Sequence, residues 1–283
     1  MKILMQIKKA IITAAAPDQK RLPLQTVVDR SGNSGTALSL LLDEITSAGI
    51  EEVAIVVCPG QAERYATAAG QHHDKLQFFE QDEPKGYGDA LLRARDFTEG
   101  QSFLHLVGDH LYVSRNGESC AKQLITVAER EACSVSAIQA TRENKLGYYG
   151  VIGGSPVAMQ PGMFEVTTVL EKPTPTVAEQ QLIVAGQRAG HYLCLFGMHV
   201  LTQQVFELLE ESIQALGPGQ NANLSDSLNK LAQSQRYLAS LLDGERYNIG
   251  EKYGLLLAQL AIALSGEERD TVLTELVELV SRR

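Results

Sequence analysis

LSLLLDEITSAGIEEVAIVV, residues 38–57, is the stretch that decides the fold. Its first half repeats apolar residues at helical spacing: Leu38, Leu41, Leu42 and Ile45. This spacing predicts a helix over Thr36–Ala48 that stops at Gly49. The β-branched run Val53–Val57 then predicts a short buried strand. A helix that leads through a tight turn into a buried strand is typical of α/β proteins.

The same alternation of helix and strand continues on both sides of this stretch. Predicted strands cover Lys9–Ala14, Leu76–Phe79, Ser102–Val107 and Ser134–Ala140, and predicted helices cover Asp89–Phe97 and Glu118–Glu131. This order predicts a mainly parallel sheet with helices on both faces. Such sheets bind ligands at the carboxyl ends of their strands. Those ends are the turns at Ala14–Pro17 and Gly108–Asp109.

The second half of the chain has a more mixed pattern. Extended segments are predicted at Tyr148–Ile152, Phe164–Leu170, His191–Phe196 and Tyr237–Leu242, and helices at Thr202–Gln214 and Ser225–Gln233. After Glu251 the tail is helical twice, with a break at Ser265. Its last helix has an apolar stripe made of Leu273, Leu276, Val277 and Val280. The stripe indicates packing on its own domain or, alternatively, contact with a second copy in a homo-oligomer.

The composition excludes some classes of function. The chain has 283 residues and a net charge of −9, whereas general nucleic-acid binding depends on a cationic surface. Lys8 and Lys9 interrupt the apolar N-terminus, and no apolar run approaches the roughly 18 residues that span a bilayer. We therefore expect a cytoplasmic protein with no nucleic-acid and no membrane partner. The four cysteines have no metal-ligand spacing, so we expect buried reduced thiols.

Five further stretches carry residues suited to ligand chemistry. They are Gln81-Asp-Glu-Pro-Lys-Gly-Tyr-Gly-Asp-Ala90, Leu106-Val-Gly-Asp-His110, Tyr149-Gly-Val-Ile152 with Glu171-Lys172-Pro173, Asn223-Leu-Ser-Asp226, and Tyr247-Asn-Ile-Gly-Glu-Lys-Tyr-Gly254. Together with residues 38–57, and in this order, they resemble the bacterial UTP–glucose-1-phosphate uridylyltransferase family from Ala10 to about Leu260. The resemblance implies an α/β, Rossmann-like nucleotidyltransferase fold with a mixed, mostly parallel central sheet. It also implies one domain, with a nucleotide half over about 1–140, a sugar half over about 141–264, and a C-terminal helix over 267–283.

The resemblance assigns a role to each matching residue. The nucleotide would contact Ala14, Ala15, Gln81, Gly86, Gly88 and Asp109. Gln81 would meet the uracil edge, because an amide supplies both a donor and an acceptor. Asp89, where the family commonly has His, suits a helix N-terminus. The sugar phosphate would contact Gly150, Glu171, Lys172 and Gly197. Carboxylates suit sugar hydroxyls and an ammonium suits a phosphate.

The family also binds Mg²⁺ through two aspartates. Asp109 matches the first ligand, Asn248 stands at the second, and His110 replaces a neighbouring acidic residue. Taken on their residues alone, these positions have simpler interpretations. Asp109 fits an Asx-turn, and Asn248 with Glu251 fits a capping box that opens a helix. The Gly86-Tyr-Gly88 segment fits an ordinary turn before a helix, and Glu171-Lys172 fits an exposed pair before a proline.

The largest departure from the family is the phosphate loop. The family has Ala-Ala-Gly-x-Gly-Thr-Arg and then Pro-Lys-Glu, where this chain reads Ala14-Ala-Ala-Pro-Asp-Gln-Lys-Arg-Leu-Pro23. Ala16 and Asp18 fill the glycine positions, so positive φ is disfavoured there. At about 5 Å from a phosphate, with an effective dielectric constant near 20, the Asp18 carboxylate costs roughly 3 kcal/mol of binding. Lys20 and Arg21, with Lys172, are the candidate catalytic cations.

The resemblance implies transfer of a uridylyl group from UTP to a sugar 1-phosphate, glucose 1-phosphate first, with release of pyrophosphate. We favour a working enzyme. The alternative is a catalytically inactive relative that binds a sugar nucleotide as a sensor or partner protein. A third hypothesis is an interaction protein that uses the acidic surface and the C-terminal helices. The sequence leaves the sugar, the base and the oligomeric state open.

Overall fold

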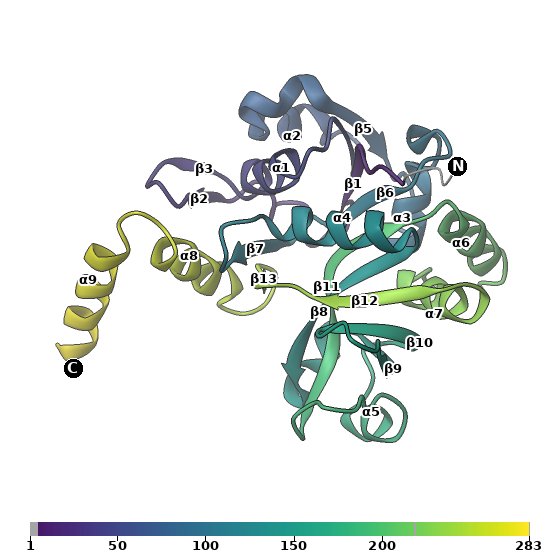
Figure 1. The fold of residues 1–283 in the computed structure, drawn as a ribbon. Coiled ribbons are helices and arrows are strands. Elements are labelled where there is room, and N and C mark those ends of the chain that lie inside the picture. The colour runs from purple at the N-terminus through teal and green to yellow at the C-terminus, as the bar shows by residue number, and fades with distance from the viewer. Residues whose placement is uncertain (1–4, 218, 283) are drawn as a thin grey trace.

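A nine-stranded sheet organises the molecule (Figure 1). The structure is a computed structural model that describes residues 5–217 and 219–282. From one edge to the other the strands are β5 (Leu76–Glu80), β4 (Glu52–Val57), β1 (Lys9–Ala14), β6 (Phe103–Val107), β11 (His191–Leu201), β8 (Ser134–Arg142), β12 (Tyr237–Leu241), β10 (Met163–Glu171) and β9 (Gly150–Pro156). β9, the last strand in this order, also pairs with β11, which lies in the middle of the sheet.

The sheet is mixed, as the resemblance implied, but it is not mostly parallel as expected. Four neighbouring pairs are parallel, namely β5–β4, β4–β1, β1–β6 and β8–β12. The other four, β6–β11, β11–β8, β12–β10 and β10–β9, are antiparallel. Helical crossovers join the strands of the first half, which makes them parallel. The second half contains β9 and β10, which are joined by a short turn and therefore run in opposite directions.

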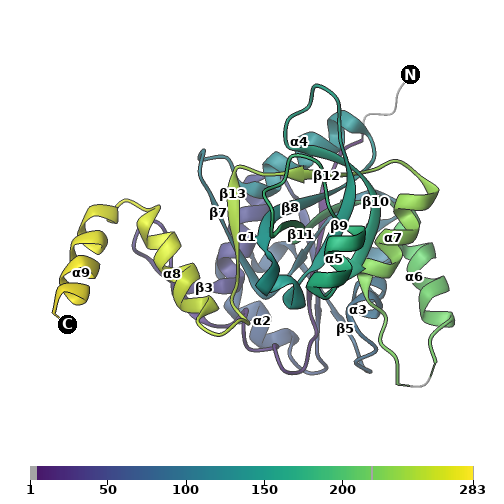
Figure 2. The same cartoon turned by 90° about the horizontal axis from the view of Figure 1, so that it is seen from below.

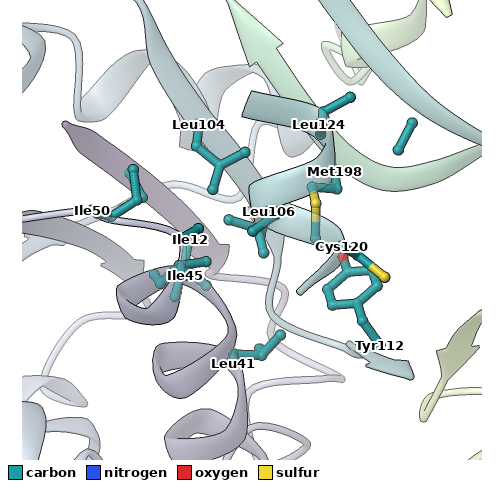
Figure 3. Packing of buried hydrophobic residues seen from close by; sticks show 14 of the residues in the cluster. Ile12, Leu41, Ile45, Ile50, Leu104, Leu106, Tyr112, Cys120, Leu124 and Met198 are labelled. Atoms are coloured by element: carbon teal, nitrogen blue, oxygen red, sulfur yellow. The ribbon is translucent and has the colours of Figure 1, made fainter. Parts of the chain in front are cut away.

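Helices cover both faces of the sheet, because its strands are buried on both sides. Neighbouring residues of β1 show this alternation, since Ile12 belongs to one hydrophobic cluster and Ile11 to the other. On the Ile12 face lie α1 (Ala37–Ser47) and α4 (Cys120–Glu131), and Figure 3 shows Leu41 and Leu124 of these helices in the same cluster as Ile12. The other face carries α3 (Tyr87–Arg93), α6 (Gln204–Gln214) and α7 (Leu224–Ser234). The remaining body helices are α2 (Ala62–Ala68) and α5 (Pro175–Gln181).

Two small antiparallel pairs accompany the main sheet, and the sequence patterns predicted neither. One pairs β2 (Thr26–Val28) with β3 (Ser34–Thr36). The other pairs β7 (His110–Ser114) with β13 (Gly244–Asn248), in a register that sets Asn248 opposite His110. The backbone N–H of Ile249 also donates to the carbonyl oxygen of Asp109 at 2.8 Å. The β7–β13 pair therefore brings two distant segments together at the end of β6.

The C-terminal helices α8 (Gly254–Leu264) and α9 (Arg269–Ser281) project from the body on one side (Figures 1 and 2). None of the described side chains of α9 is buried. Val277 is 61% exposed and Val280 is 74% exposed, so the interpretation that this stripe packs on its own domain is wrong. Across residues 5–217 and 219–282, no helix combines the length and the apolar character needed to cross a membrane.

Candidate functional site

A cavity of about 540 Å³ opens where β1, β5 and β6 end. These strands run parallel to one another, so their carboxyl ends share one edge of the sheet. Ten of the residues predicted for the site line this cavity: Ala14, Ala15, Gln81, Gly86, Asp109, Gly150, Glu171, Lys172, Gly197 and Asn248. Lys20, Arg21 and Gly88 are absent from the lining. One cavity therefore contains both halves of the predicted site.

The Gly86-Tyr-Gly88 turn is held by the segment before α7. Gly86 has a φ of +105°, and a Cβ on it would lie 2.5 Å from the carbonyl oxygen of Ala222. The N–H of Gly88 donates to that same carbonyl at 2.9 Å. A Cβ on Gly88 would lie 2.7 Å from Leu209, so this glycine serves the packing of α3 on α6. The turn is thus a fixed wall of the cavity.

Gln81 comes directly after β5 and is only 5% exposed. Its Nε2 donates to the carbonyl oxygen of Gly86 at 3.1 Å and to Oδ2 of Asp89 at 2.7 Å. Asp89 lies in the first turn of α3, as its residue type predicts, and is 4% exposed. Arg93, one turn further along α3, pairs with the same carboxylate at 3.3 Å. Both hydrogens of the Gln81 amide are therefore already used within the protein, so only its oxygen remains as an acceptor.

Asp109 stands at the turn between β6 and β7, where its Oδ1 lies 2.8 Å from Nδ1 of His110. Burial alone would raise the pKa of this carboxyl. The His110 ring and the Lys172 ammonium outweigh that effect, so the pKa of Asp109 lies below its ordinary value. Asp109 is therefore a carboxylate at neutral pH.

The oxygens present suit Mg²⁺ only when a nucleotide shares its coordination. Among the residues that the structure describes, no three His, Cys, Asp or Glu side chains are grouped to hold a metal ion. Asp109 offers one carboxylate, and Oδ1 of Asn248 already accepts the N–H of Gly250 at 2.8 Å, which leaves it one lone pair. Mg²⁺ commonly binds through one or two carboxylates plus substrate phosphates and water. Asp109 supplies one carboxylate, which is the smallest number in that pattern.

Glu171 and Lys172 also line the cavity, at the end of β10. Oε2 of Glu171 accepts a 2.6 Å hydrogen bond from Ser225, in the first turn of α7. A Cβ on Gly150 would lie 2.8 Å from the Ser225 hydroxyl and 3.3 Å from Glu171. Any residue larger than glycine at this position would therefore crowd the Ser225–Glu171 hydrogen bond. Lys172 has a φ of +46°, a region that costs free energy for a side-chain-bearing residue. Its backbone N–H donates to Tyr149 at 3.1 Å, which holds this geometry.

The rewritten phosphate loop folds into consecutive turns without a positive φ. The N–H of Gln19 donates to Ala16, and the N–H of Leu22 donates to Gln19, at 3.0 and 2.8 Å. Within the described chain, the residues with positive φ lie outside this loop, as Ala16 and Asp18 predict. Asp18 is exposed and is absent from the cavity lining. Lys172 is the one Lys or Arg side chain among the described residues that line the cavity.

A buried polar network under the cavity escaped the sequence analysis. The Tyr87 hydroxyl lies 3.2 Å from the His105 ring, and the Thr13 hydroxyl lies 3.3 Å from Nε2 of that ring. Behind it, Nδ1 of His199 lies 2.5 Å from the Ser136 hydroxyl. Burial lowers the pKa of His105 and brings that of His199 to about 3, so both rings are neutral at pH 7. The sequence signal that could have revealed this network is His105, a histidine within the apolar run Phe103–Val107.

The capping-box interpretation of Asn248 and Glu251 is wrong. Helix α8 begins at Gly254, and its N-cap Tyr253 makes no side-chain capping bond. The Glu251 carboxylate instead accepts a hydrogen bond from the Tyr149 hydroxyl and pairs with Lys145 at 3.2 Å. Tyr149 in turn lies beneath the Arg246 guanidinium, 3.8 Å from its ring centre. Sequence distance separates these partners, so no local pattern predicted them.

Comparison with known proteins agrees with this architecture. The nucleotidyl transferase family model matches residues 30–263. A UTP–glucose-1-phosphate uridylyltransferase 2 of Streptococcus pyogenes serotype M3 is 27% identical, over 92% of this chain and 91% of that protein. The UTP–glucose-1-phosphate uridylyltransferase of Streptococcus pneumoniae serotype 4 is 26% identical, over 97% of this chain and 96% of that protein.

Solved structures give the same result for the fold. A UDP-glucose pyrophosphorylase complexed with UDP-glucose superposes with a TM-score of 0.74, at 24% identity, over 90% of this chain and 98% of that one. A UTP-bound enzyme from Acinetobacter baumannii also gives 0.74, at 21% identity, over 96% of this chain and 99% of that one. The family model covers most of the chain, including the cavity-lining residues of β6 to α7. The chain therefore belongs to the nucleotidyl transferase family.

Proposed function

We propose that this protein transfers a uridylyl group from UTP to a sugar 1-phosphate, with glucose 1-phosphate as the first candidate, and releases pyrophosphate. The observation that supports this most strongly is the single cavity that contains Gln81, Asp109 and the Glu171–Lys172 pair. Relatives of similar length are named for this reaction, which agrees with the proposal.

The nucleotide lies in the half of the cavity formed by the ends of β1, β5 and β6. The base meets Gln81, and the glycine at position 86 lets the backbone come close to it. The phosphates run toward Asp109 and the Ala14–Pro17 turn. Mg²⁺, when bound, supplies positive charge that offsets the negative charge developing on the phosphates. Asp109, with Asn248 also in the cavity lining, would hold the ion.

The sugar phosphate lies in the other half of the cavity. The Glu171 carboxylate, held by Ser225, accepts hydrogen bonds from sugar hydroxyls. The Lys172 ammonium binds the phosphate and keeps it beside the nucleotide. An oxygen of this phosphate attacks the α-phosphorus of UTP and forms a new P–O bond. The bond between the α-phosphorus and the bridging oxygen breaks, and pyrophosphate leaves with the electron pair. Positioning and charge neutralisation account for most of the catalysis.

A second candidate function follows from the low positive charge of the cavity. UTP is a polyanion, and among the described lining residues Lys172 faces the two carboxylates Asp109 and Glu171. A cavity of this kind holds a sugar nucleotide, which has one phosphate fewer, more easily than UTP. The second candidate is therefore a protein that binds UDP-sugars without turnover.

Pyrophosphate release in the presence of UTP, glucose 1-phosphate and Mg²⁺ tests the first candidate. We expect release that depends on both substrates. Lys172→Met should lower kcat/KM by about 100-fold, because it removes the cation that holds the attacking phosphate. Lys75→Met removes the same charge from an exposed side chain outside the cavity and should change kcat/KM by less than about 3-fold.

The results of these assays decide between the two candidate functions. No release from several nucleoside triphosphates and sugar phosphates, together with calorimetric binding of UDP-glucose, supports the non-catalytic protein. No release and no binding of UDP-glucose would contradict both. Equal losses in the Lys172 and Lys75 variants would contradict the assignment of the sugar-phosphate site.

A further inference from the structure

The side-chain amide of Gln81 is held in one orientation by two groups that can only accept hydrogen bonds. One is the backbone carbonyl oxygen of Gly86 and the other is the Asp89 carboxylate. An ionised carboxylate has no hydrogen to donate, so it accepts from the NH₂ end of the amide and repels the oxygen end. Turning the amide over would place its oxygen against two acceptors. The environment therefore fixes which end of Gln81 carries the hydrogens.

The remaining hydrogen-bonding capacity of Gln81 belongs to its Oε1. In the described chain this oxygen accepts no hydrogen bond, and it is not among the enclosed side-chain atoms that lack a partner. It is therefore open to the cavity that Gln81 lines. A ligand at this position meets an acceptor alone, although an amide in general offers both a donor and an acceptor.

Asp89 is held as firmly as the amide it orients. It is 4% exposed and lies on α3, whose Arg93 approaches its two oxygens at 3.3 and 3.5 Å. Removing the carboxylate from this position would leave the Gly86 carbonyl oxygen as the one remaining acceptor of the two, because a neutral Asn or Ala imposes no such preference. Asp89 is thus part of the arrangement around the base position and more than a residue suited to a helix N-terminus.

We propose that Asp89 is a positioning residue that sets base specificity: by holding Gln81 as an acceptor, it selects a pyrimidine whose ring N3 carries a hydrogen. This inference rests on the proposed function, in which the base lies against Gln81. Uracil and thymine carry N3–H and can donate to Oε1. Cytosine has an unprotonated N3, so two acceptors would face each other and both would lose a partner on burial.

Calorimetric binding of UDP-glucose and CDP-glucose tests the proposal without any need for turnover. The unmodified protein should bind UDP-glucose between about 5-fold and 150-fold more tightly than CDP-glucose. This is the range expected for the cost of leaving a buried acceptor unpaired. Asp89→Asn has nearly the same shape and can present either its oxygen or its NH₂ to Gln81. In this variant the ratio of the two dissociation constants should fall by at least about 5-fold, mainly because CDP-glucose binds better.

Asp82→Asn is the matched control. It removes the same charge one residue away from Gln81, from an exposed side chain. The ratio should stay within about 2-fold of that of the unmodified protein, since no group that orients the amide has changed. Gln81→Met is the second variant, because it fills similar space without an amide and should bring the ratio toward one. Thermal melting of each variant shows that the chain is folded when binding is measured.

The outcomes distinguish this inference from the proposed function. If the unmodified protein binds UDP-glucose and Asp89→Asn keeps the full preference over CDP-glucose, the inference is overturned and the proposed function stands. If Asp82→Asn lowers the ratio as much as Asp89→Asn, a general charge effect replaces the orienting role. If the unmodified protein binds neither sugar nucleotide, the proposed function and the inference both fail.

Discussion

The Ser225 hydroxyl donates a 2.6 Å hydrogen bond to Oε2 of Glu171 and joins the start of α7 to the end of β10. Ser225 is 3% exposed, and a Cβ on Gly150 would contact both partners. The carboxylate proposed to bind sugar hydroxyls is therefore fixed before any ligand arrives. Such fixing lowers the entropy that a ligand must remove on binding.

Ser225→Ala should weaken sugar-phosphate binding and leave the chemical step less affected. We expect the KM for glucose 1-phosphate to rise about 5- to 10-fold, which corresponds to about 1 kcal/mol, the net contribution of one typical hydrogen bond, with kcat changed less than about 3-fold. Ser234→Ala is the control, because that serine bonds only to a backbone carbonyl at the far end of α7. A fall in kcat without a change in KM would contradict this role of Ser225.

Asn248→Asp should strengthen Mg²⁺ binding, because it adds a second carboxylate beside Asp109. The concentration of Mg²⁺ that gives half-maximal pyrophosphate release should fall by at least about 10-fold, since even partners outside the coordination shell change metal affinity 10- to 100-fold. Asn221→Asp adds the same charge elsewhere in the cavity lining and should have a much smaller effect. If both variants lowered this Mg²⁺ concentration equally, the effect would come from the added negative charge in general and not from a second metal ligand at position 248.

Local patterns predicted most elements of the fold, because buried strands and amphipathic helices leave their periods in the sequence. The predicted strand Lys9–Ala14 matches β1 residue for residue. The predicted helix Asp89–Phe97 is wrong at both ends, since α3 covers Tyr87–Arg93. Beyond Arg93 the chain forms a short 3₁₀-helix over Asp96–Thr98, in which Phe97 packs edge-on against Phe79 with ring centres 6.2 Å apart.

The site follows the same division between local and long-range information. Motif resemblance predicted Gln81 and Glu171, and both line the cavity. Their orienting partners were missed, because Asp89 looks like an ordinary first-turn residue and Ser225 is 54 residues from Glu171. The sequence analysis also placed the Asp18 carboxylate near a phosphate, whereas Asp18 is exposed and absent from the cavity lining that includes its neighbours Pro17 and Gln19.

Asp18→Asn should improve UTP binding by a few-fold, well below the two orders of magnitude that the sequence suggested. Asp18 is exposed, so water with a dielectric constant near 80 reduces the repulsion at about 5 Å to roughly 0.8 kcal/mol, or about 4-fold in affinity. The gain should disappear in about 0.5 M salt, which screens exposed charges. Calorimetry with UTP at two salt concentrations measures it. A gain that survives high salt would place this carboxylate closer to the phosphates.

Glu44 should make the stability of the fold depend on pH. Burial raises its pKa to about 7 from 4.5, although its carboxylate accepts the N–H of Ala121 at 2.8 Å and has Arg30 nearby. Because the folded pKa is the higher one, the stability that Glu44 contributes is complete below pH 4.5 and is lost as the pH rises through 7.

Glu44→Gln keeps a neutral side chain at every pH. Relative to this variant, the unmodified protein should lose free energy of unfolding between pH 4.5 and 7 and then remain constant above pH 8. Urea unfolding across this range measures the difference, and a difference that is independent of pH would contradict the assignment.

Removal of α9 should leave the stability of a single chain almost unchanged. None of its described side chains is buried, so deletion of residues 269–283 exposes little apolar surface, and the melting temperature should shift by less than about 2 °C. Deletion from residue 254 onward is the contrasting case, because Ala258 and Ile262 of α8 belong to the main hydrophobic cluster and their loss should lower the melting temperature clearly. A large fall on deletion of α9 alone would show that a contact outside the single chain covers its apolar stripe. The homo-oligomer predicted from the sequence would then be supported if the fall grows with protein concentration, since association stabilises a folded chain by mass action.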